Sequence, residues 1–347
     1  MTNQHSKILT PLCVGVVHWY SEDEIAISIS NALAQLGHEP VPLHPGERIA
    51  KNLQIVIAYG PFGSFVPITR QLLASPAQDR PRLIWWITEQ FPNPNLPEWL
   101  RFSAGSLRSF LERMAYFRGS TGEWQLRPGG KWIISKAHRF RYYGDLYWLQ
   151  RTGLLSGLAT PSRWTAGFLR ARGFHPVVAY IGSDPRLGAD LNLERDLPVL
   201  WLGKAGTQRR KQLLEKVRSD LRARGIDLFM VDGEEHPFTF GEERTRLFNR
   251  TRIALNLLRE PWDDNSLRYY LAALNHTMIV TEPTFPHTPF QNKIHIAEAP
   301  VEQLADTICY YLAHETERQQ IAANAYQLVS QELTMTRAVE AILNGMK

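Results

Sequence analysis

Three cations gather where a helix is predicted to begin. Gly203 and Lys204 follow a short apolar run, and Arg209 and Arg210 open the helix predicted over 209–224. Acidic side chains are favoured at helix N-termini because the helix dipole is positive there, so three cations are unfavourable unless an anion sits among them. Backbone N–H groups at a helix start already bind anions. We therefore predict a phosphate site at Gly203, Lys204, Arg209 and Arg210; the alternative is a solvated basic turn.

A second helix start of the same kind lies further along the chain. Asn265 or Ser266 can cap the helix predicted over 266–274, and Arg268 places a cation in its first turn. A strand predicted over 253–257 precedes it. Both basic helix N-termini follow strands of the same predicted domain. Together they fit the diphosphate of a nucleotide bound at the carboxyl edge of a parallel sheet.

The elements that must position these residues alternate between strands and helices, which predicts parallel sheets of βαβ units. The first half has predicted strands at 12–17, 39–43, 53–58, 82–87 and 177–181, with helices at 21–37 and 162–172. The second half has predicted strands at 199–202, 227–231, 253–257 and 278–280, and further helices at 244–249, 301–314 and 315–331. The stretch 89–153 is predicted to be largely irregular.

These patterns predict two Rossmann-like α/β domains. The first covers residues 1–182 on the acceptor side, and the second covers residues 197–330 and binds the nucleotide. A polar segment at 183–196, rich in Gly, Pro and Asp, is predicted to link them. A C-terminal helix within 331–347 could pack back on the first domain.

Composition and missing motifs exclude several classes. The 347 residues are 44% hydrophobic and 21% charged, as in folded soluble proteins, and two cysteines cannot build a disulfide framework. The sequence lacks an apolar run long enough to span a bilayer and a signal-peptide pattern at residues 1–7, so we expect a cytoplasmic protein. It also lacks a Gly-x-Gly-x-x-Gly fingerprint, a Walker A motif, an Asp-x-Asp pair and a zinc-type cluster. No cofactor or metal is expected.

The net charge of +5 is unevenly placed. Residues 99–151 contain ten basic and three acidic residues, an excess of +7, interleaved with aromatic side chains. Such a stretch suits an anionic membrane, a phosphorylated substrate or nucleic acid, and the alternative is an ordinary solvated face over an aromatic core. No nucleic-acid motif accompanies it, so a nucleic-acid partner is not expected.

The second half resembles the C-terminal domain of GT-B glycosyltransferases of the family-4-like group, with the CgeB-like spore-maturation proteins as nearer relatives. The matching stretches lie at 194–203, 253–257, 265–268, 280–283, 302–306 and 333–337. The resemblance implies a GT-B fold, with two Rossmann-like domains facing across a cleft. It also implies metal-independent transfer of a hexosyl-type sugar from a nucleotide-sugar donor to a glycan, lipid-linked or other acceptor.

The resemblance assigns roles to several residues. Lys204, Arg209 or Arg210, and Arg268 would stabilise the leaving diphosphate, while Asp232 ends a strand where the base is usually held. Retaining family-4 enzymes carry two acids in a Glu-x7-Glu motif; the first falls at Asp263, which can still accept sugar hydroxyls. The second falls at Leu271, which cannot bind ribose, so another group such as Glu282 would take over or donor binding is altered.

Two residues of the first half are candidates for a catalytic base. His18 ends the first predicted strand, where inverting GT-B enzymes often place their base, and its ordinary pKa suits proton transfer near neutrality. The alternative is a histidine packed beside aromatic neighbours. Glu89, after the strand at 82–87, is a second candidate base or an acceptor contact. Retention and inversion both stay open.

Two further expectations concern partners. The basic, aromatic stretch at 99–151 predicts an anionic acceptor, either a lipid-linked glycan or a phosphorylated or acidic saccharide. A peripheral contact with the cytoplasmic face of a membrane would accompany the lipid-linked acceptor. Because Leu271 replaces an acid, the alternative function is a catalytically silent GT-B-like protein that binds a nucleotide sugar or a partner.

Overall fold

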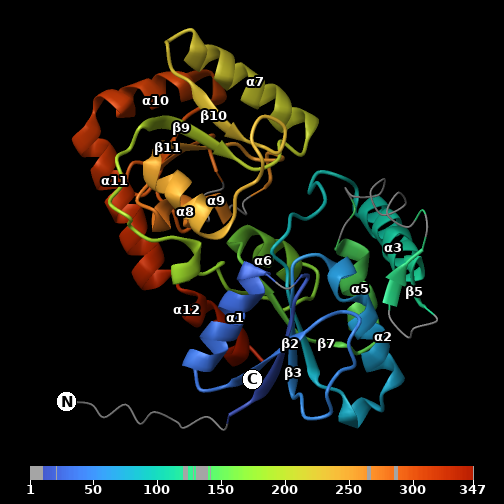
Figure 1. The fold of residues 1–347 in the computed structure, drawn as a ribbon. Helices are drawn as coiled ribbons and strands as arrows, with labels where there is room; N and C mark the ends of the chain where they lie inside the picture. Colours follow the sequence, from blue (N-terminus) through green and yellow to red (C-terminus); the bar gives the residue numbers. More distant parts are fainter. Residues whose placement is uncertain are drawn as a thin grey trace. The chain divides into compact units, whose positions relative to one another are not determined.

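A computed structural model describes residues 11–20, 22–119, 124–127, 129, 140, 142–263, 267–284 and 288–346. The chain divides into two compact units (Figure 1). The N-terminal unit contains Met1–Ile87, Asn95–Ala159 and Ile342–Lys347, and the C-terminal unit contains Thr88–Pro94 and Thr160–Ala341.

The first sheet has six strands in the order β2-β1-β3-β4-β7-β8. Their bounds are β1 (Cys13–Val17), β2 (Glu39–Leu43), β3 (Ile55–Tyr59), β4 (Arg82–Trp86), β7 (Leu155–Thr160) and β8 (Val177–Val178). The pairings from β2 through to β7 are parallel. All of β1 and most of β3 are buried, as expected for apolar strands covered on both faces of a parallel sheet.

Four helices of this part of the chain are α1 (Glu24–Gln35), α2 (Val66–Ala74), α3 (Glu98–Ala115) and α5 (Tyr143–Arg151). A short antiparallel pair, β5 (Tyr116–Arg118) and β6 (Trp124–Leu126), follows α3. The prediction of a largely irregular stretch at 89–153 is wrong, because α3 alone is 18 residues long.

The contact between α3 and α5 is polar and very close. A Cβ atom on Gly144 would lie 2.2 Å from the carbonyl oxygen of Gly105, so only glycine lets the two backbones approach this far. Arg108 Nη1 lies 2.8 Å from Glu112 Oε2 and 3.3 Å from Asp145 Oδ2, with all three side chains buried. Burial and the charge of Glu112 raise the pKa of Asp145 to about 7. The core-facing side of α3 is therefore its charged side.

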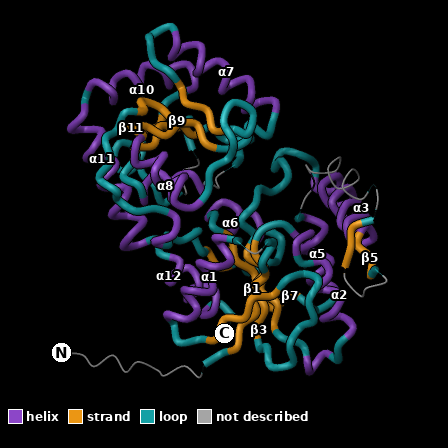
Figure 2. Tube along the Cα trace, in the orientation of Figure 1, coloured by secondary structure: helices purple, strands orange, loops and turns teal. Residues whose placement is uncertain are grey.

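The second sheet has five parallel strands in the order β10-β9-β11-β12-β13, shown as orange strands among purple helices in Figure 2. The strands are β9 (Leu197–Leu202), β10 (Leu228–Val231), β11 (Thr251–Asn256), β12 (Met278–Thr281) and β13 (Ala297–Glu298). The helices are α6 (Arg163–Arg170), α7 (Gln208–Arg222), α8 (Gly241–Arg250), α9 (Leu267–Leu274), α10 (Leu304–Ala313), α11 (Glu315–Gln327) and α12 (Met335–Asn344). Apolar side chains of α7, α10 and α11 form one buried core with the strands.

The predicted elements of the second half are confirmed within a few residues. The fold prediction of two parallel α/β sheets is confirmed as well. Because the strands of the second sheet are parallel, the residues that follow them share one edge of that sheet. Gly203, Asp232, Leu257 and Glu282 each lie directly after one of these strands.

The segment 184–196 has little regular structure, yet side chains of the C-terminal unit hold it along its length. Asn249 donates from Nδ2 to the Ala189 carbonyl at 2.8 Å and accepts from the Leu191 N–H at 2.7 Å. Asn275 Oδ1 accepts from the Ala189 N–H at 3.3 Å. Arg195 donates to four acceptors on α8, on β11 and in the turn before β12.

Candidate functional site

The turn between β9 and α7 places basic side chains at a capped helix N-terminus. Thr207 is the N-cap of α7: its Oγ1 accepts from the Arg210 N–H at 3.3 Å and donates to the Arg259 carbonyl at 2.7 Å. Arg209 and Arg210 therefore stand in the first helical turn, as predicted. Gly203 has φ +119°, and a Cβ there would lie 3.0 Å from Arg268 Nη2, so this glycine allows Arg268 to approach the turn.

Arg210 and Arg268 meet over the indole of Trp201. Their guanidinium carbons lie 5.7 Å and 4.3 Å from the ring centroid. Arg268 donates from Nε to the Leu202 carbonyl and from Nη1 to Asn256 Oδ1, and Arg210 donates from Nη1 to the Lys204 carbonyl. Among the described residues, neither guanidinium forms an ion pair with a carboxylate. Arg210 is buried and Arg268 is partly buried, so two cations lie close to one indole ring with no ion pair to a carboxylate of the described residues.

Burial and neighbouring arginines affect the pKa values of these two side chains more strongly than the nearby carboxylates of Asp263 and Glu282 do. Desolvation and repulsion by neighbouring arginines lower the pKa of Arg268 to about 9 and that of Arg210 to about 10. The charged form of each side chain is therefore destabilised in the ligand-free protein. A bound anion would reverse this effect, because an opposite charge nearby favours the charged form.

Arg209, by contrast, has its counterion. Its Nη2 lies 2.5 Å from Glu282 Oε2, and its Nη1 donates to the Leu258 carbonyl at 2.9 Å. Glu282 also accepts from the Leu258 N–H at 2.6 Å. The structure brings these two predicted donor-binding residues together and joins them to each other, so most of Glu282's acceptor capacity is used internally.

Asp263 and Glu89 are joined by a residue that the sequence did not single out. Arg259 donates from Nε to Asp263 Oδ2 at 2.9 Å and from Nη1 to Glu89 Oε2 at 3.1 Å. Burial lowers the pKa of Arg259, but the two carboxylates outweigh that effect and raise its pKa overall. Close to these residues in sequence, Trp262 Nε1 donates to the Phe91 carbonyl at 3.2 Å. Both predicted carboxylates therefore belong to one cluster of the C-terminal unit.

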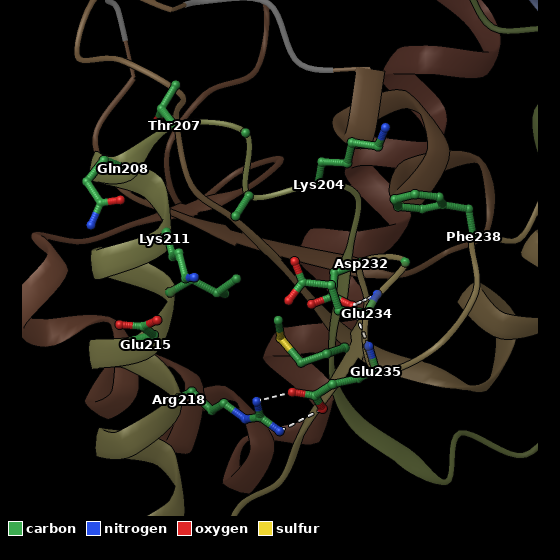
Figure 3. A pocket seen from close by; sticks show the side chains of 15 residues that line it. Lys204, Thr207, Gln208, Lys211, Glu215, Arg218, Asp232, Glu234, Glu235 and Phe238 are labelled. Atoms are coloured by element: carbon green, nitrogen blue, oxygen red, sulfur yellow. Dashed lines mark hydrogen bonds and ion pairs between the residues drawn. The ribbon is translucent and has the colours of Figure 1, made fainter.

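A pocket of about 790 Å³ opens beside the turn between β9 and α7 (Figure 3). One wall is the first three turns of α7, and the other carries Lys204 and Phe238, with the Lys204 ammonium 5.5 Å from the Phe238 ring centroid. Asp232 Oδ1 accepts from the N–H groups of Glu234 and Glu235, both at 2.9 Å, and so shapes the loop after β10. The pocket has the size of a small-molecule site.

His18 lies in the N-terminal unit, directly after β1. It is buried, and its Nε2 has no hydrogen-bond partner among the residues that the structure describes. Its ring centroid lies 5.6 Å from that of His44. Desolvation lowers the pKa of His18, with His44 adding to the shift and Asp23 opposing it. The side chain is therefore neutral at pH 7 and has one ring nitrogen available.

Three further positions from the sequence analysis lie in or next to α9. Asn265 and Ser266 lie outside the described residues. Leu271, which replaces the second acid of the family-4 motif, is buried within α9 and cannot contact a ribose hydroxyl.

The residues missed by sequence reasoning are Trp201, Asn256 and Arg259. Trp201 stands within an apolar strand and looks like an ordinary core residue, since nothing local shows that two arginines cover its ring. Arg259 carried a usable signal, because it follows a strand that was predicted correctly, at the edge where Gly203 and Glu282 lie.

Comparisons with known proteins identify the fold. Residues 209–344 match the family model described as glycosyl transferase-like. The chain has the GT-B fold. Its structure resembles TarM of S. aureus (TM-score 0.57, 9% identity), and the match covers 94% of this chain and 59% of TarM. It also resembles HepE from Anabaena in complex with UDP-glucose (0.57, 10%) and sucrose-phosphate synthase from Thermosynechococcus elongatus (0.58, 9%), each match covering 96% of this chain and 98% of the other. No curated protein matches the sequence.

The predicted resemblance to GT-B glycosyltransferases is thereby confirmed. The chain spans less than two thirds of the length of TarM. Within the described residues no helix is long and apolar enough to cross a membrane, and no three His, Cys, Asp or Glu side chains gather as a metal site would require.

Proposed function

We propose that this GT-B protein is a glycosyltransferase that takes a sugar from a nucleotide-sugar donor. The observation that carries the proposal is the pair of cations, Arg210 and Arg268, held over Trp201 without a carboxylate partner among the described residues. They stand beside the N-terminus of α7, whose dipole and N–H groups also favour an anion. A donor diphosphate supplies that anion. HepE and TarM, which share the fold, have been solved with UDP-glucose and UDP.

The same cations would assist bond breaking. When the glycosidic bond to the donor breaks, negative charge grows on the departing diphosphate. Preorganised cations and helix N–H groups aimed at that charge stabilise the transition state more than the ground state. Lys204 can add a third charge from the pocket rim. This mechanism assigns to side chains the role that a divalent cation has in other transferases.

The pocket beside Lys204 suits the nucleoside. Phe238 and the aliphatic part of Met230 offer apolar contact for a base, and Asp232 orders the loop that borders it. Ribose binding cannot use Leu271. We propose that polar groups of the pocket wall, on the first turns of α7 or in the loop after β10, take its place.

The chemistry at the sugar involves the carboxylates and His18. Asp263, oriented by Arg259, is proposed to accept hydroxyls of the transferred sugar, and Glu89 is proposed to serve as a base or an acceptor contact. A lowered pKa keeps His18 neutral at pH 7, and its Nε2 has no partner among the described residues, as a base that takes a proton from the acceptor requires. The anomeric configuration of the product decides between inversion through His18 and retention. The acceptor is proposed to be an anionic glycan or a lipid-linked one.

One observation favours a second candidate function. Leu271 is a buried apolar residue at the position where the family-4 motif has its second acid. Without that acid, the protein could bind a nucleotide sugar without turning it over. Binding without hydrolysis or transfer with any acceptor would favour that silent role.

The test is a thermal-shift screen of UDP, GDP, ADP and their sugar conjugates with three proteins. The parent should be stabilised by one nucleotide family through mass action. Arg268→Met should lose that stabilisation, whereas Arg224→Gln should keep it. Arg224 is the matched control because it lies beyond the opposite end of α7 and pairs with Asp306 at the surface. Equal nucleotide shifts in Arg268→Met and in the parent would overturn the proposal.

A further inference from the structure

The loop after β10 is held in place where it borders the pocket. Its residue Glu235 forms a two-point ion pair with Arg218 of α7, in which Arg218 Nη2 lies 2.7 Å from Glu235 Oε2 (Figure 3). His236 Nδ1 lies 2.8 Å from the Met230 carbonyl oxygen, and the Gly233 N–H donates to the His236 carbonyl at 2.9 Å. A loop tied both to α7 and to its own strand presents its remaining polar groups to a ligand in a preorganised arrangement.

Phe238 packs against the backbone of this loop. Gly233 has φ +89°, and a Cβ there would lie 2.6 Å from Phe238 Cε2, so only glycine lets the ring come this close. The ring lines the pocket and offers a flat apolar surface to a base. Stacking on an aromatic ring contributes affinity for every base. Discrimination between bases must therefore come from the polar groups around Phe238.

Two carboxylates of the pocket keep acceptor capacity for a ligand. Asp232 is half-buried and Glu234 is exposed. Asp232 uses Oδ1 for the N–H groups of Glu234 and Glu235, but its Oδ2 and the carboxylate of Glu234 have no partner among the described residues. Burial raises the pKa of Asp232, but the N–H groups of Glu235 and Glu234 outweigh burial and lower it overall. Both acceptors are therefore charged at neutral pH.

The hydrogen-bonding edges of the common bases differ in how they suit such acceptors. Guanine has two adjacent donors, N1–H and the 2-amino group, which can approach carboxylate oxygens together, and hydrogen bonds to an ionised acceptor are the strong ones. Uracil has one N–H between two carbonyl oxygens, and carboxylates repel those oxygens. Adenine and cytosine each place an amino group beside a ring nitrogen that is itself an acceptor. Guanine is thus the base that fits these carboxylates best.

We propose that the pocket selects guanine, so that the donor is a GDP-sugar, with the carboxylates of Asp232 and Glu234 accepting from N1–H and the 2-amino group. This inference rests on the proposed function, because it takes the pocket to hold the nucleoside of the donor. Lys211 of α7 lines the same pocket, and its ammonium has no partner among the described residues, so it is available to the O6 carbonyl of guanine.

The experiment is calorimetric titration of the full chain with GDP, IDP, UDP and ADP. The parent should bind GDP at least about tenfold more tightly than each of the others, the fold-change expected for one hydrogen bond to a charged group. IDP is the sharpest comparison, because it lacks only the 2-amino group. Glu234→Gln and Asp232→Asn should each lower the preference for GDP over IDP. Asparagine keeps the side-chain oxygen that accepts from the two loop N–H groups, so the loop should stay folded.

A matched control and a converse ligand sharpen the test. Glu340→Gln changes an exposed glutamate of α12 and should keep the parent's preference. Xanthosine diphosphate has a carbonyl oxygen where GDP has the 2-amino group. The side-chain amides of Asp232→Asn/Glu234→Gln can donate to that oxygen, so this double variant should prefer xanthosine diphosphate to GDP, whereas the parent should prefer GDP.

Three results would overturn the inference. The first is equal binding of GDP and IDP by the parent, and the second is an unchanged preference for GDP in the double variant. The third is an equal loss of affinity for all four nucleotides in that variant, which would assign the carboxylates to the ribose. UDP binding that equals GDP binding and depends on Arg268 would overturn this inference and leave the proposed function standing. Absence of binding by every diphosphate would overturn both.

Discussion

Arg259 and Glu89 form an ion pair, Nη1 to Oε2 at 3.1 Å, across 170 positions of the chain. The same guanidinium holds Asp263 through its Nε. One side chain thus sets the positions of the two carboxylates proposed to contact sugar. Arginine suits this task because its fixed fork of donors can bind two carboxylates at once.

Replacing Arg259 should separate binding from turnover. Arg259→Met leaves buried Asp263 without this cation, and we expect a loss of about 1.5–3 kcal/mol in transition-state stabilisation, the range for a hydrogen bond to a charged group. Steady-state kinetics should show kcat falling roughly ten- to hundredfold while the nucleotide thermal shift is retained. Arg224→Gln is the control. Parental kcat in Arg259→Met would remove this cluster from the chemistry.

Removing Arg268 should have opposite effects on stability and binding. Burial lowers the pKa of its guanidinium, which has no ion pair with a carboxylate of the described residues, so Met of similar length should leave the free energy of unfolding unchanged or raise it. Nucleotide affinity should fall by about 1.5–3 kcal/mol. Urea unfolding and calorimetric titration of the same variant measure the two quantities. A stability loss equal to that of Arg318→Met, which removes a buried guanidinium paired with the half-exposed carboxylate of Glu315, would show that Arg268 is structural instead.

The pH dependence should follow from His18. A base is active when deprotonated, and burial lowers the pKa of His18, so kcat/KM should rise with pH below 6.5 and be flat at neutral pH. His18→Gln should reduce kcat by roughly 10²–10⁴-fold, the range for general base catalysis, and abolish this acid limb. An unaltered pH profile in His18→Gln would assign the limb to another group and favour retention.

Gly144 should tolerate no side chain. An added methyl group would lie 2.2 Å from the Gly105 carbonyl, and overpacking of this kind typically costs about 1–3 kcal/mol. We expect Gly144→Ala to lower Tm clearly. Gly167→Ala, at a helical position with nothing within 4 Å of the added carbon, is the matched control. Equal Tm values for the two variants would show that α3 can shift away from α5.

Chelation should leave transfer largely intact. Arg210, Arg268 and the α7 N-terminus are proposed to neutralise the leaving diphosphate, so no divalent cation is assigned that role. Activity measured with EDTA should stay within about twofold of the untreated value, a difference of less than 1 kcal/mol in the barrier. Complete loss with EDTA and recovery with magnesium or manganese would contradict the cation mechanism.

Sequence reasoning succeeded where a signal is local. The turn after β9 and the first turn of α7 were predicted from charges that conflict with a helix dipole, and the structure puts Thr207, Arg209 and Arg210 in that arrangement. It failed for α3, because that helix buries arginines and exposes aromatic residues, which reverses the pattern used to recognise a helix. It missed Arg259 because its partner Glu89 is remote in sequence. It predicted Arg209 and Glu282 separately but could not show that they neutralise each other.

The hydrogen bonds that hold the segment 184–196 should slow its hydrogen exchange and its proteolysis. The N–H groups of Ala189 and Leu191 donate to the side chains of Asn275 and Asn249. Asn249 lies on α8 and Asn275 directly follows α9, so these amides exchange only when that part of the unit opens locally. The segment that the sequence predicts to be a linker should therefore exchange deuterium at these two amides as slowly as the amides of a β-strand do. It should also resist trypsin at Arg195, whose guanidinium is engaged by four acceptors.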